Sequence, residues 1–343
     1  IQMDGLQIEI IDINNEEERN EVKRFLNTFN LNYEKDIDYT VVLREKGDIV
    51  ATASKGKNIL KGFAINHKLQ GEGITAMLVN SLLDRLFYEE IYHSFIFTKP
   101  ENIDIFSSLG FKLLYKAQKA ALLESGIYDI HDHIKKLIKK HNIDITKSRS
   151  ALVMNCNPFT KGHRYLIEKA SKVSNEVLVF VVEEDKSVFP FESRYNMVKD
   201  GTFDLNNVKV IRGGEYIISL ATFPTYFLKK EDDILKTYTD IDAGIFAKYF
   251  CKELNIDRRF VGEEPYCNVT SAYNDSLLKQ LEKFNIDLTV IPRMSIDGEA
   301  ISASKVRTLI KNGDINKLEA LLPSVTLEFL QTEIGKEIAG DIT

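Results

Sequence analysis

The sequence predicts an α/β protein with two domains, a mixed α+β domain followed by a doubly wound parallel sheet. Three observations lead to this fold class. The chain has 343 residues, which suits two domains of about 150 residues each. The first hundred-odd residues contain strand-like segments joined by short turns. From Ser150 onward, apolar strands alternate with amphipathic helices about five times, and this alternation is typical of a parallel sheet.

The composition excludes several classes of function. Hydrophobic residues make up 44% and charged residues 28% of the chain, as in an ordinary globular protein. A net charge of -6 argues against nucleic acid or a membrane surface as partner, and no apolar stretch approaches the roughly 18 residues of a membrane span. Three cysteines without a C-x-x-C pair favour a reducing compartment, and therefore the cytoplasm.

The first domain is expected over residues 1–124. Residues 39–67 alternate apolar and polar side chains around Gly- and Asn-containing turns, which predicts strands joined by hairpins. Residues 73–89 carry apolar side chains at helical spacing. A short strand over 93–99, a helix ending at Gly110 and a final strand complete the pattern. Residues 125–148 have an apolar stripe with lysines between its members and are expected to form a connecting helix or linker.

The second domain is expected over residues 149–343, with helices at its C-terminal end. Its first strand, "ALVMN", is followed directly by "NPFTKGH" (157–163) and a helix. The next strand, "EVLVFVV" (176–182), is apolar throughout, as expected for a strand covered on both faces. Strands near 208–211, 258–262 and 288–292 alternate with helices near 193–200, 243–254, 274–284 and 303–313. Ligands bind beyond the carboxyl ends of such strands, and this is where "NPFTKGH" lies.

The "TKGH" segment has the chemistry of a phosphate site. The start of a helix offers unpaired N–H groups and a partial positive charge, which together favour phosphate. Gly162 allows a phosphate to approach without a Cβ in the way. His163 and the Thr160 hydroxyl can donate to the same oxygens, which would stabilise negative charge developing on an α-phosphate.

Two further stretches offer similar groups. Ser302 and Ser304 lie where a late helix should begin, and Arg307 follows on its first turns; a guanidinium suits phosphate oxygens. Lys186 and Arg194 bracket a Pro-containing turn after the second strand. Each stretch alone is also typical of a capped helix or of solvated cations.

Together these stretches resemble the H-x-G-H nucleotidyltransferase superfamily. Thr160–His163 matches its first motif, with threonine in the place of the first histidine, as in the pantetheine-phosphate adenylyltransferase branch. Ile301–Arg307 matches its late motif, I-S-S-T-x-x-R, with Ala303 and Ser304 as departures. The resemblance implies that Thr160 and His163 act on the α-phosphate and that Lys186 and Arg307 act on the phosphate tail. It also implies a set of nucleotide-binding residues: Asn157, Pro158, Phe159, Gly162, Arg194, Gly262, Ser302 and Ser304.

The resemblance narrows to the citrate lyase ligase family over nearly the full length. It rests on "VMNCNPFTKGHRYLIEKA", on "FVGEEPYCNVT" and on an acetyltransferase-like first domain in the same chain. The family implies a ligase that uses acetate, ATP and Mg²⁺ and acetylates the thiol of the prosthetic group on the acyl-carrier subunit of citrate lyase. AMP and pyrophosphate are released. No residue of the chain is expected to bind a metal directly.

In the first domain, "LQGEGITAMLV" resembles the acetyl-CoA loop of GCN5-related acetyltransferases. Gln70 and Gly73 match the pattern, and Thr75 replaces its last small residue. The resemblance implies that the N–H groups of this loop hold the pyrophosphate of a CoA-like arm. No convincing general base accompanies the loop.

Two alternatives remain open on the sequence. The chain could be a plain adenylyltransferase that joins AMP to a pantetheine or nicotinamide phosphate. The first domain could instead be a non-catalytic module that binds a CoA-like arm or docks a partner.

Overall fold

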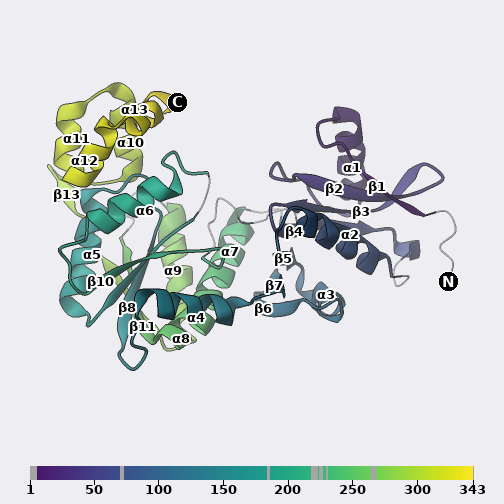
Figure 1. Ribbon diagram of the computed structural model, residues 1–343, viewed down its shortest axis with the longest axis horizontal. Coiled ribbons are helices and arrows are strands. Elements are labelled where there is room, and N and C mark those ends of the chain that lie inside the picture. The colour runs from purple at the N-terminus through teal and green to yellow at the C-terminus, as the bar shows by residue number, and fades with distance from the viewer. Residues whose placement is uncertain are drawn as a thin grey trace. The chain divides into compact units, whose positions relative to one another are not determined.

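The chain forms two compact units, which we describe separately (Figure 1). The computed structural model describes residues 6–69, 73–183, 186–217, 223, 227–228, 231–263 and 268–342. The first unit comprises residues 1–129 and 224–241, and the second comprises 130–223 and 242–343. The segment 224–241 therefore groups with the first unit, although it lies between two strands of the second unit in the sequence.

The first unit is built on a mixed seven-stranded sheet in the order β1-β2-β3-β4-β5-β7-β6. Helix α1 packs on one face through Val22 and Leu26, and α2 packs on the other through residues such as Leu78 and Leu82. The elements are β1 (Gln7–Ile10), α1 (Glu16–Thr28), β2 (Tyr39–Glu45), β3 (Asp48–Gly56), β4 (Ile59–Ile65), η1 (His67–Leu69), α2 (Ile74–Tyr88), β5 (His93–Thr98), η2 (Pro100–Asn102), α3 (Ile103–Ser108), β6 (Lys112–Lys116) and β7 (Ala121–Gly126).

Strands β4 and β5 are parallel and pair through Ile59↔Phe95 and Leu60↔Ile96, near the start of β4. Beyond these pairs lies a cavity of about 710 Å³, lined by residues 63–65 of β4, Thr98 of β5 and the first residues of α2. The cavity thus occupies the region where the paired part of the two strands has ended.

The second unit contains a five-stranded parallel sheet in the order β10-β9-β8-β11-β12. Its elements are α4 (Ile130–His141), β8 (Arg149–Met154), α5 (Lys161–Val173), β9 (Val177–Val181), α6 (Phe191–Asp200), β10 (Val208–Arg212), α7 (Glu231–Ile245), the π-helix η3 (Phe246–Cys251), α8 (Lys252–Leu254), β11 (Ile256–Gly262), α9 (Asn268–Glu282), β12 (Asp287–Ile291), β13 (Ser295–Ile296), β14 (Glu299–Ala300), α10 (Ala303–Asn312), α11 (Ile315–Leu321), α12 (Ser324–Gln331) and α13 (Glu333–Asp341). The strand order reverses between β8 and β11, and such a switch point is where doubly wound sheets bind ligands.

The fold class expected from the sequence is confirmed: an α+β unit precedes a doubly wound parallel sheet. All five residues of β9 are buried, because helices cover both faces of the sheet. The main core of this unit joins β8 and β9 to α5, α6 and the C-terminal helices. Those helices, α10 to α13, form a group beside α6 (Figure 1).

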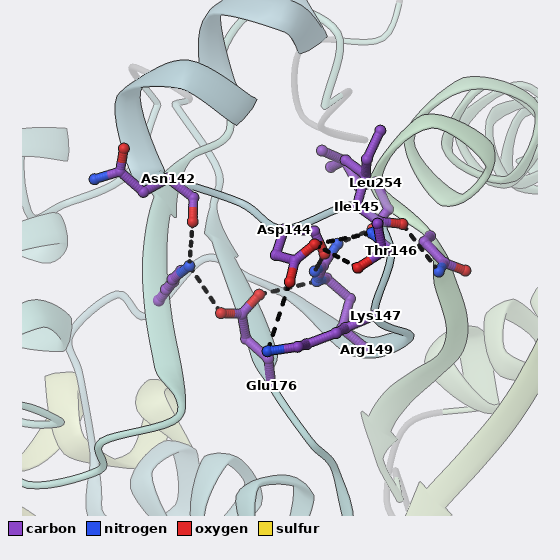
Figure 2. A network of polar contacts seen from close by, with 10 residues as sticks. Asn142, Asp144, Ile145, Thr146, Lys147, Arg149, Glu176 and Leu254 are labelled. Carbon is purple, nitrogen blue, oxygen red and sulfur yellow. Dashed lines mark hydrogen bonds and ion pairs between the residues drawn. The ribbon is translucent and has the colours of Figure 1, made fainter.

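Arg149 is the first residue of β8, whereas "TKGH" follows the other end of this strand. The Arg149 side chain belongs to a network of polar contacts (Figure 2). This side chain is buried, and its Nε donates to Glu176 Oε1 at 2.9 Å. Its Nη2 donates to Asp144 O at 2.6 Å, and its Nη1 donates to Leu254 O. Lys209 on β10 also pairs with Glu176, at 2.8 Å. One guanidinium therefore joins the segment before β8 to the starts of β9 and β11.

Across the described residues, every helix is too short or too polar to cross a bilayer.

Candidate functional site

The segment after β8 forms a helix cap in which His163 is a partner. Thr160 is the N-cap of α5, and its Oγ1 accepts a hydrogen bond from the backbone N–H of His163 at 3.3 Å. The backbone N–H of Thr160 in turn donates to Nδ1 of His163 at 3.0 Å. This reciprocal pair is a capping box with an imidazole in the position where Glu or Gln is usual. The imidazole is therefore fixed by the cap.

This geometry sets the protonation state of His163. A backbone N–H can only donate, so Nδ1 must be the acceptor and the ring proton must lie on Nε2. Burial and, to a smaller extent, the positive charge of Arg293 together lower the pKa of His163 to about 4. The ring stacks against Phe159, with centroids 6.1 Å apart. Near neutral pH, His163 is consequently an uncharged ring with an N–H donor at Nε2.

The two sequence motifs lie against each other. A Cβ added to Gly162 would be 3.4 Å from Cβ of Ile301, the first residue of the late motif. Nη1 of Arg307 on α10 donates to Asn157 O at 2.6 Å. Burial lowers the pKa of Arg307, so this half-buried cation is only partly hydrated. Residues 139 and 150 positions apart in sequence thus come together beyond the carboxyl end of β8.

The C-terminal helices also hold this segment from a second side. Lys161 Nζ donates to Glu319 O at 2.7 Å, and the buried Thr326 Oγ1 donates to Phe159 O at 2.8 Å. The middle of the 157–163 segment is therefore bound to α11 and α12, and its first residue to α10.

At the start of α10, Ser302 is the N-cap and accepts from the backbone N–H of Lys305 at 3.2 Å. Its hydroxyl lies 3.2 Å from that of Ser304, which is exposed. Two hydroxyls and a helix N-terminus are thus adjacent to Ile301 and to the "TKGH" segment.

Arg194 is fully buried among main-chain oxygens. Its Nε donates to Phe189 O at 2.9 Å, and its Nη1 donates to Asn155 O at 2.7 Å and Val182 O at 2.8 Å. The sequence suggested Arg194 as a nucleotide-binding residue. These contacts favour another role, in which Arg194 holds the segments after β8 and β9 together.

The remaining predicted residues lie around the same edge of the sheet. Lys186 is exposed and follows β9, and Gly262 ends β11. The Asn157–Pro158 bond is cis, and Pro158 and Phe159 are buried. Asn157 Oδ1 accepts from the backbone N–H of Phe189 at 2.9 Å.

Cys156 lies between β8 and the 157–163 segment but is not an available nucleophile. Burial raises the pKa of its thiol to about 12, although Arg194 opposes the shift. The thiol therefore stays protonated at neutral pH.

The sequence reasoning missed Arg293, which lies two residues beyond β12. Its Nε donates to Glu263 O at 2.8 Å, and its Nη1 lies 3.5 Å from Ile301 O. A cation directly after the apolar "LTVIP" could have been found by the criterion that identified "TKGH", namely polar residues at the carboxyl end of a strand.

In the first unit, Gly73 lies at the edge of the 710 Å³ cavity and is the N-cap of α2, with a left-handed φ of 75°. Residues 73–76 line the cavity beside aromatic and aliphatic side chains, and Lys99 lines it as well. Gln70 lies outside the described residues.

Comparisons with known proteins match parts of the chain and nearly the whole of it. The family model "Citrate lyase ligase C-terminal domain" matches residues 149–330. A phosphopantetheine adenylyltransferase of Clostridium novyi is 40% identical over 182 residues, 52% of this chain and 92% of its own. The structure of the ribosomal-protein-S18-alanine N-acetyltransferase from Escherichia coli covers 36% of this chain and 95% of its own, at 15% identity and a TM-score of 0.29.

Several curated relatives match about nine-tenths of the chain. The [citrate [pro-3S]-lyase] ligase of Escherichia coli K12 is 35% identical over 322 residues, which cover 91% of this chain and 90% of that protein. The family model accounts for the strands and motifs of the second unit, and this relative extends the match to the first. The chain belongs to the citrate lyase ligase family.

Proposed function

We propose that this chain is an ATP-dependent acid–thiol ligase that activates acetate as acetyl-AMP. The acetyl group then passes to the thiol of the prosthetic group on the acyl-carrier subunit of citrate lyase. Family membership supports the ligase and its carrier partner. The observation that carries the chemistry is the fixed imidazole of His163, in a segment whose Asn157 carbonyl binds Arg307. The scattered cysteines of the sequence favour the cytoplasm as the place of reaction.

In the first half-reaction, an acetate oxygen bonds to the α-phosphorus of ATP while the bond to the bridging oxygen of pyrophosphate breaks. Negative charge builds up on the α-phosphate oxygens. We assign Nε2–H of His163 to these oxygens, because a preorganised donor in a buried site stabilises such charge most. Arg307 and Lys186 would receive the leaving pyrophosphate, with Ser302 and Ser304 at the start of α10.

In the second half-reaction, the carrier thiol attacks the acetyl carbonyl carbon. A thioester forms, the bond to the phosphate oxygen breaks and AMP leaves, while the thiol proton passes to solvent. No nucleophile from the chain is required, and the protonated state of Cys156 agrees with this.

Mg²⁺ fits this site as a companion of ATP. Among the described residues, no three His, Cys, Asp or Glu side chains come together as metal ligands. The donors around residues 157–163 and 301–307 are N–H groups, hydroxyls and guanidinium, which suit phosphate oxygens. Mg²⁺ commonly binds through substrate phosphates and water, and there it would offset phosphate charge.

A second role concerns the first unit. Its cavity has a size typical of small-molecule sites and combines apolar walls with the N-terminus of α2, a helix of 15 residues. We assign this cavity to the CoA-like arm of the carrier, with pantetheine along the apolar side chains and pyrophosphate near residues 73–75. The unit would then be a binding module rather than a second catalyst.

ATP–pyrophosphate exchange tests the main proposal. The purified chain is given ATP, labelled pyrophosphate and a panel of small carboxylic acids, and in parallel 4′-phosphopantetheine or nicotinamide mononucleotide. Exchange that depends on acetate is expected. Exchange that appears only with a phosphorylated acceptor would replace the ligase with an adenylyltransferase.

A further inference from the structure

Arg293 joins three segments at the carboxyl edge of the parallel sheet. It follows β12, and its Nε binds the carbonyl of Glu263, directly after β11. Its Nη1 approaches the carbonyl of Ile301, just before α10, at 3.5 Å. The planar guanidinium presents donors in a fixed fork, so it can set the spacing of two carbonyls where an ammonium cannot.

One of these segments packs against the turn that carries His163. Ile301, one of the two carbonyl partners, packs against Gly162, the residue before His163. The charge of Arg293 also acts on His163 and lowers its pKa. Burial lowers the pKa of Arg293 itself, so the guanidinium is partly desolvated and its charge is less screened than that of a fully exposed cation.

The other cations near this segment point elsewhere. Arg307, from α10, donates to Asn157 O. Lys161, on the first turn of α5, donates to Glu319 O. The charge that lowers the pKa of His163, in addition to burial, is that of Arg293.

We propose that Arg293 is a positioning residue for adenylyl transfer: its guanidinium seats the segment before α10 against the Thr160–His163 turn, and its charge acts on the imidazole of that turn. Its role in the reaction rests on the proposed function, whereas its action on His163 does not. Two separable effects follow, one from the shape of the guanidinium and one from its charge.

Two substitutions separate these effects. Arg293→Lys keeps the charge and loses the fork, and Arg293→Met loses both. NMR titration of labelled histidine measures how the charge of Arg293 changes the titration midpoint of His163. The His163 signal is identified by its loss in His163→Gln. The parent midpoint is expected at about 4. Arg293→Met should raise it by up to about one pH unit, because a nearby like charge has been removed, and Arg293→Lys should leave it unchanged.

The kinetics of acetate-dependent ATP–pyrophosphate exchange measure the effect of the shape of the Arg293 guanidinium. Arg293→Lys should lower kcat by about 10- to 100-fold, the scale of a slightly misplaced reacting group, with a smaller change in the KM for ATP. Arg258→Met is the matched control, since it removes a guanidinium from β11, where Arg258 pairs with Asp287 of β12 at 3.5 Å. It should change neither readout.

Two results would overturn the inference. One is a folded Arg293→Met protein whose His163 midpoint equals that of the parent. The other is an Arg293→Lys enzyme with parental kcat. The titration uses no substrate, so it tests the charge effect even if the parent protein shows no acetate-dependent ATP–pyrophosphate exchange. The absence of that exchange would count against the proposed function instead.

Discussion

At the scale of single residues, His163 has two roles that must be separated. Its Nδ1 completes the cap of α5, and its Nε2–H is the proposed donor to phosphate. A substitution that removes the ring therefore also removes a cap, which costs about 1 kcal/mol of stability. Loss of activity in an alanine variant alone would not distinguish the two.

We therefore predict the behaviour of two variants. His163→Ala and His163→Gln should both lower the kcat of acetate-dependent exchange by about 10²–10³, the scale of one lost preorganised donor. His163→Gln should keep more of the stability, because glutamine is a usual partner in a capping box. Thermal unfolding and exchange are measured together. Near-parental exchange by a folded His163→Ala protein would end the assignment to the α-phosphate.

The low pKa of His163 also has a consequence for stability. The unfolded imidazole protonates near pH 6.5, whereas the folded one protonates near 4, so the unfolded state binds more protons in between. Stability should fall as the pH drops from about 6.5 towards 4. His163→Gln should remove this part of the acid sensitivity.

At the scale of elements, β9 could be predicted because burial on both faces makes it apolar throughout. The other strands of the second unit could be predicted from their alternation with amphipathic helices. The association of "TKGH" with "ISASKVR" could be anticipated only in part. "TKGH" follows β8 of the parallel sheet, whereas the antiparallel pair β13–β14 lies between β12 and "ISASKVR". The π-helix at Phe246–Cys251 could not, because its apolar spacing resembles that of an α-helix. The contacts of Arg194 could not either, since a buried arginine and a phosphate-binding one read alike in a sequence.

The start of β8 offers a test of stability without catalysis. Arg149→Met should destabilise the second unit by about 1–3 kcal/mol, because buried carbonyls lose their donor. The cost should stay below that of an uncompensated buried charge, because Lys209 still pairs with Glu176. Denaturant unfolding measures it. The KM for ATP should be unchanged, since the network lies at the far end of the sheet from "TKGH", and a large rise would contradict this separation.

At the scale of the whole molecule, the second unit should form acetyl-AMP, and the first unit should hold the carrier arm for acetyl transfer. We predict that Gly73→Val keeps acetate-dependent exchange and lowers acetyl transfer to subsaturating carrier by about tenfold or more, since a held arm makes thiol attack effectively unimolecular. Valine is strained at the left-handed φ of 75°. Gly47→Val is the matched control, because Gly47 has a φ of 95° with similar open space around it and lies outside the cavity lining. Equal acetyl transfer by both variants would show that the cavity of the first unit is not needed to hold the CoA-like arm.

The return of residues 224–241 to the first unit has a practical consequence for dissecting the protein. The chain passes from one unit to the other three times, after residues 129, 223 and 241. A single cut in the backbone therefore cannot release both units intact. A fragment that begins at residue 130 would carry residues 224–241, which group with the other unit, between β10 and β11 of its own sheet. Separate expression of the units calls for excising those residues and bridging the two ends, or for supplying the two fragments together.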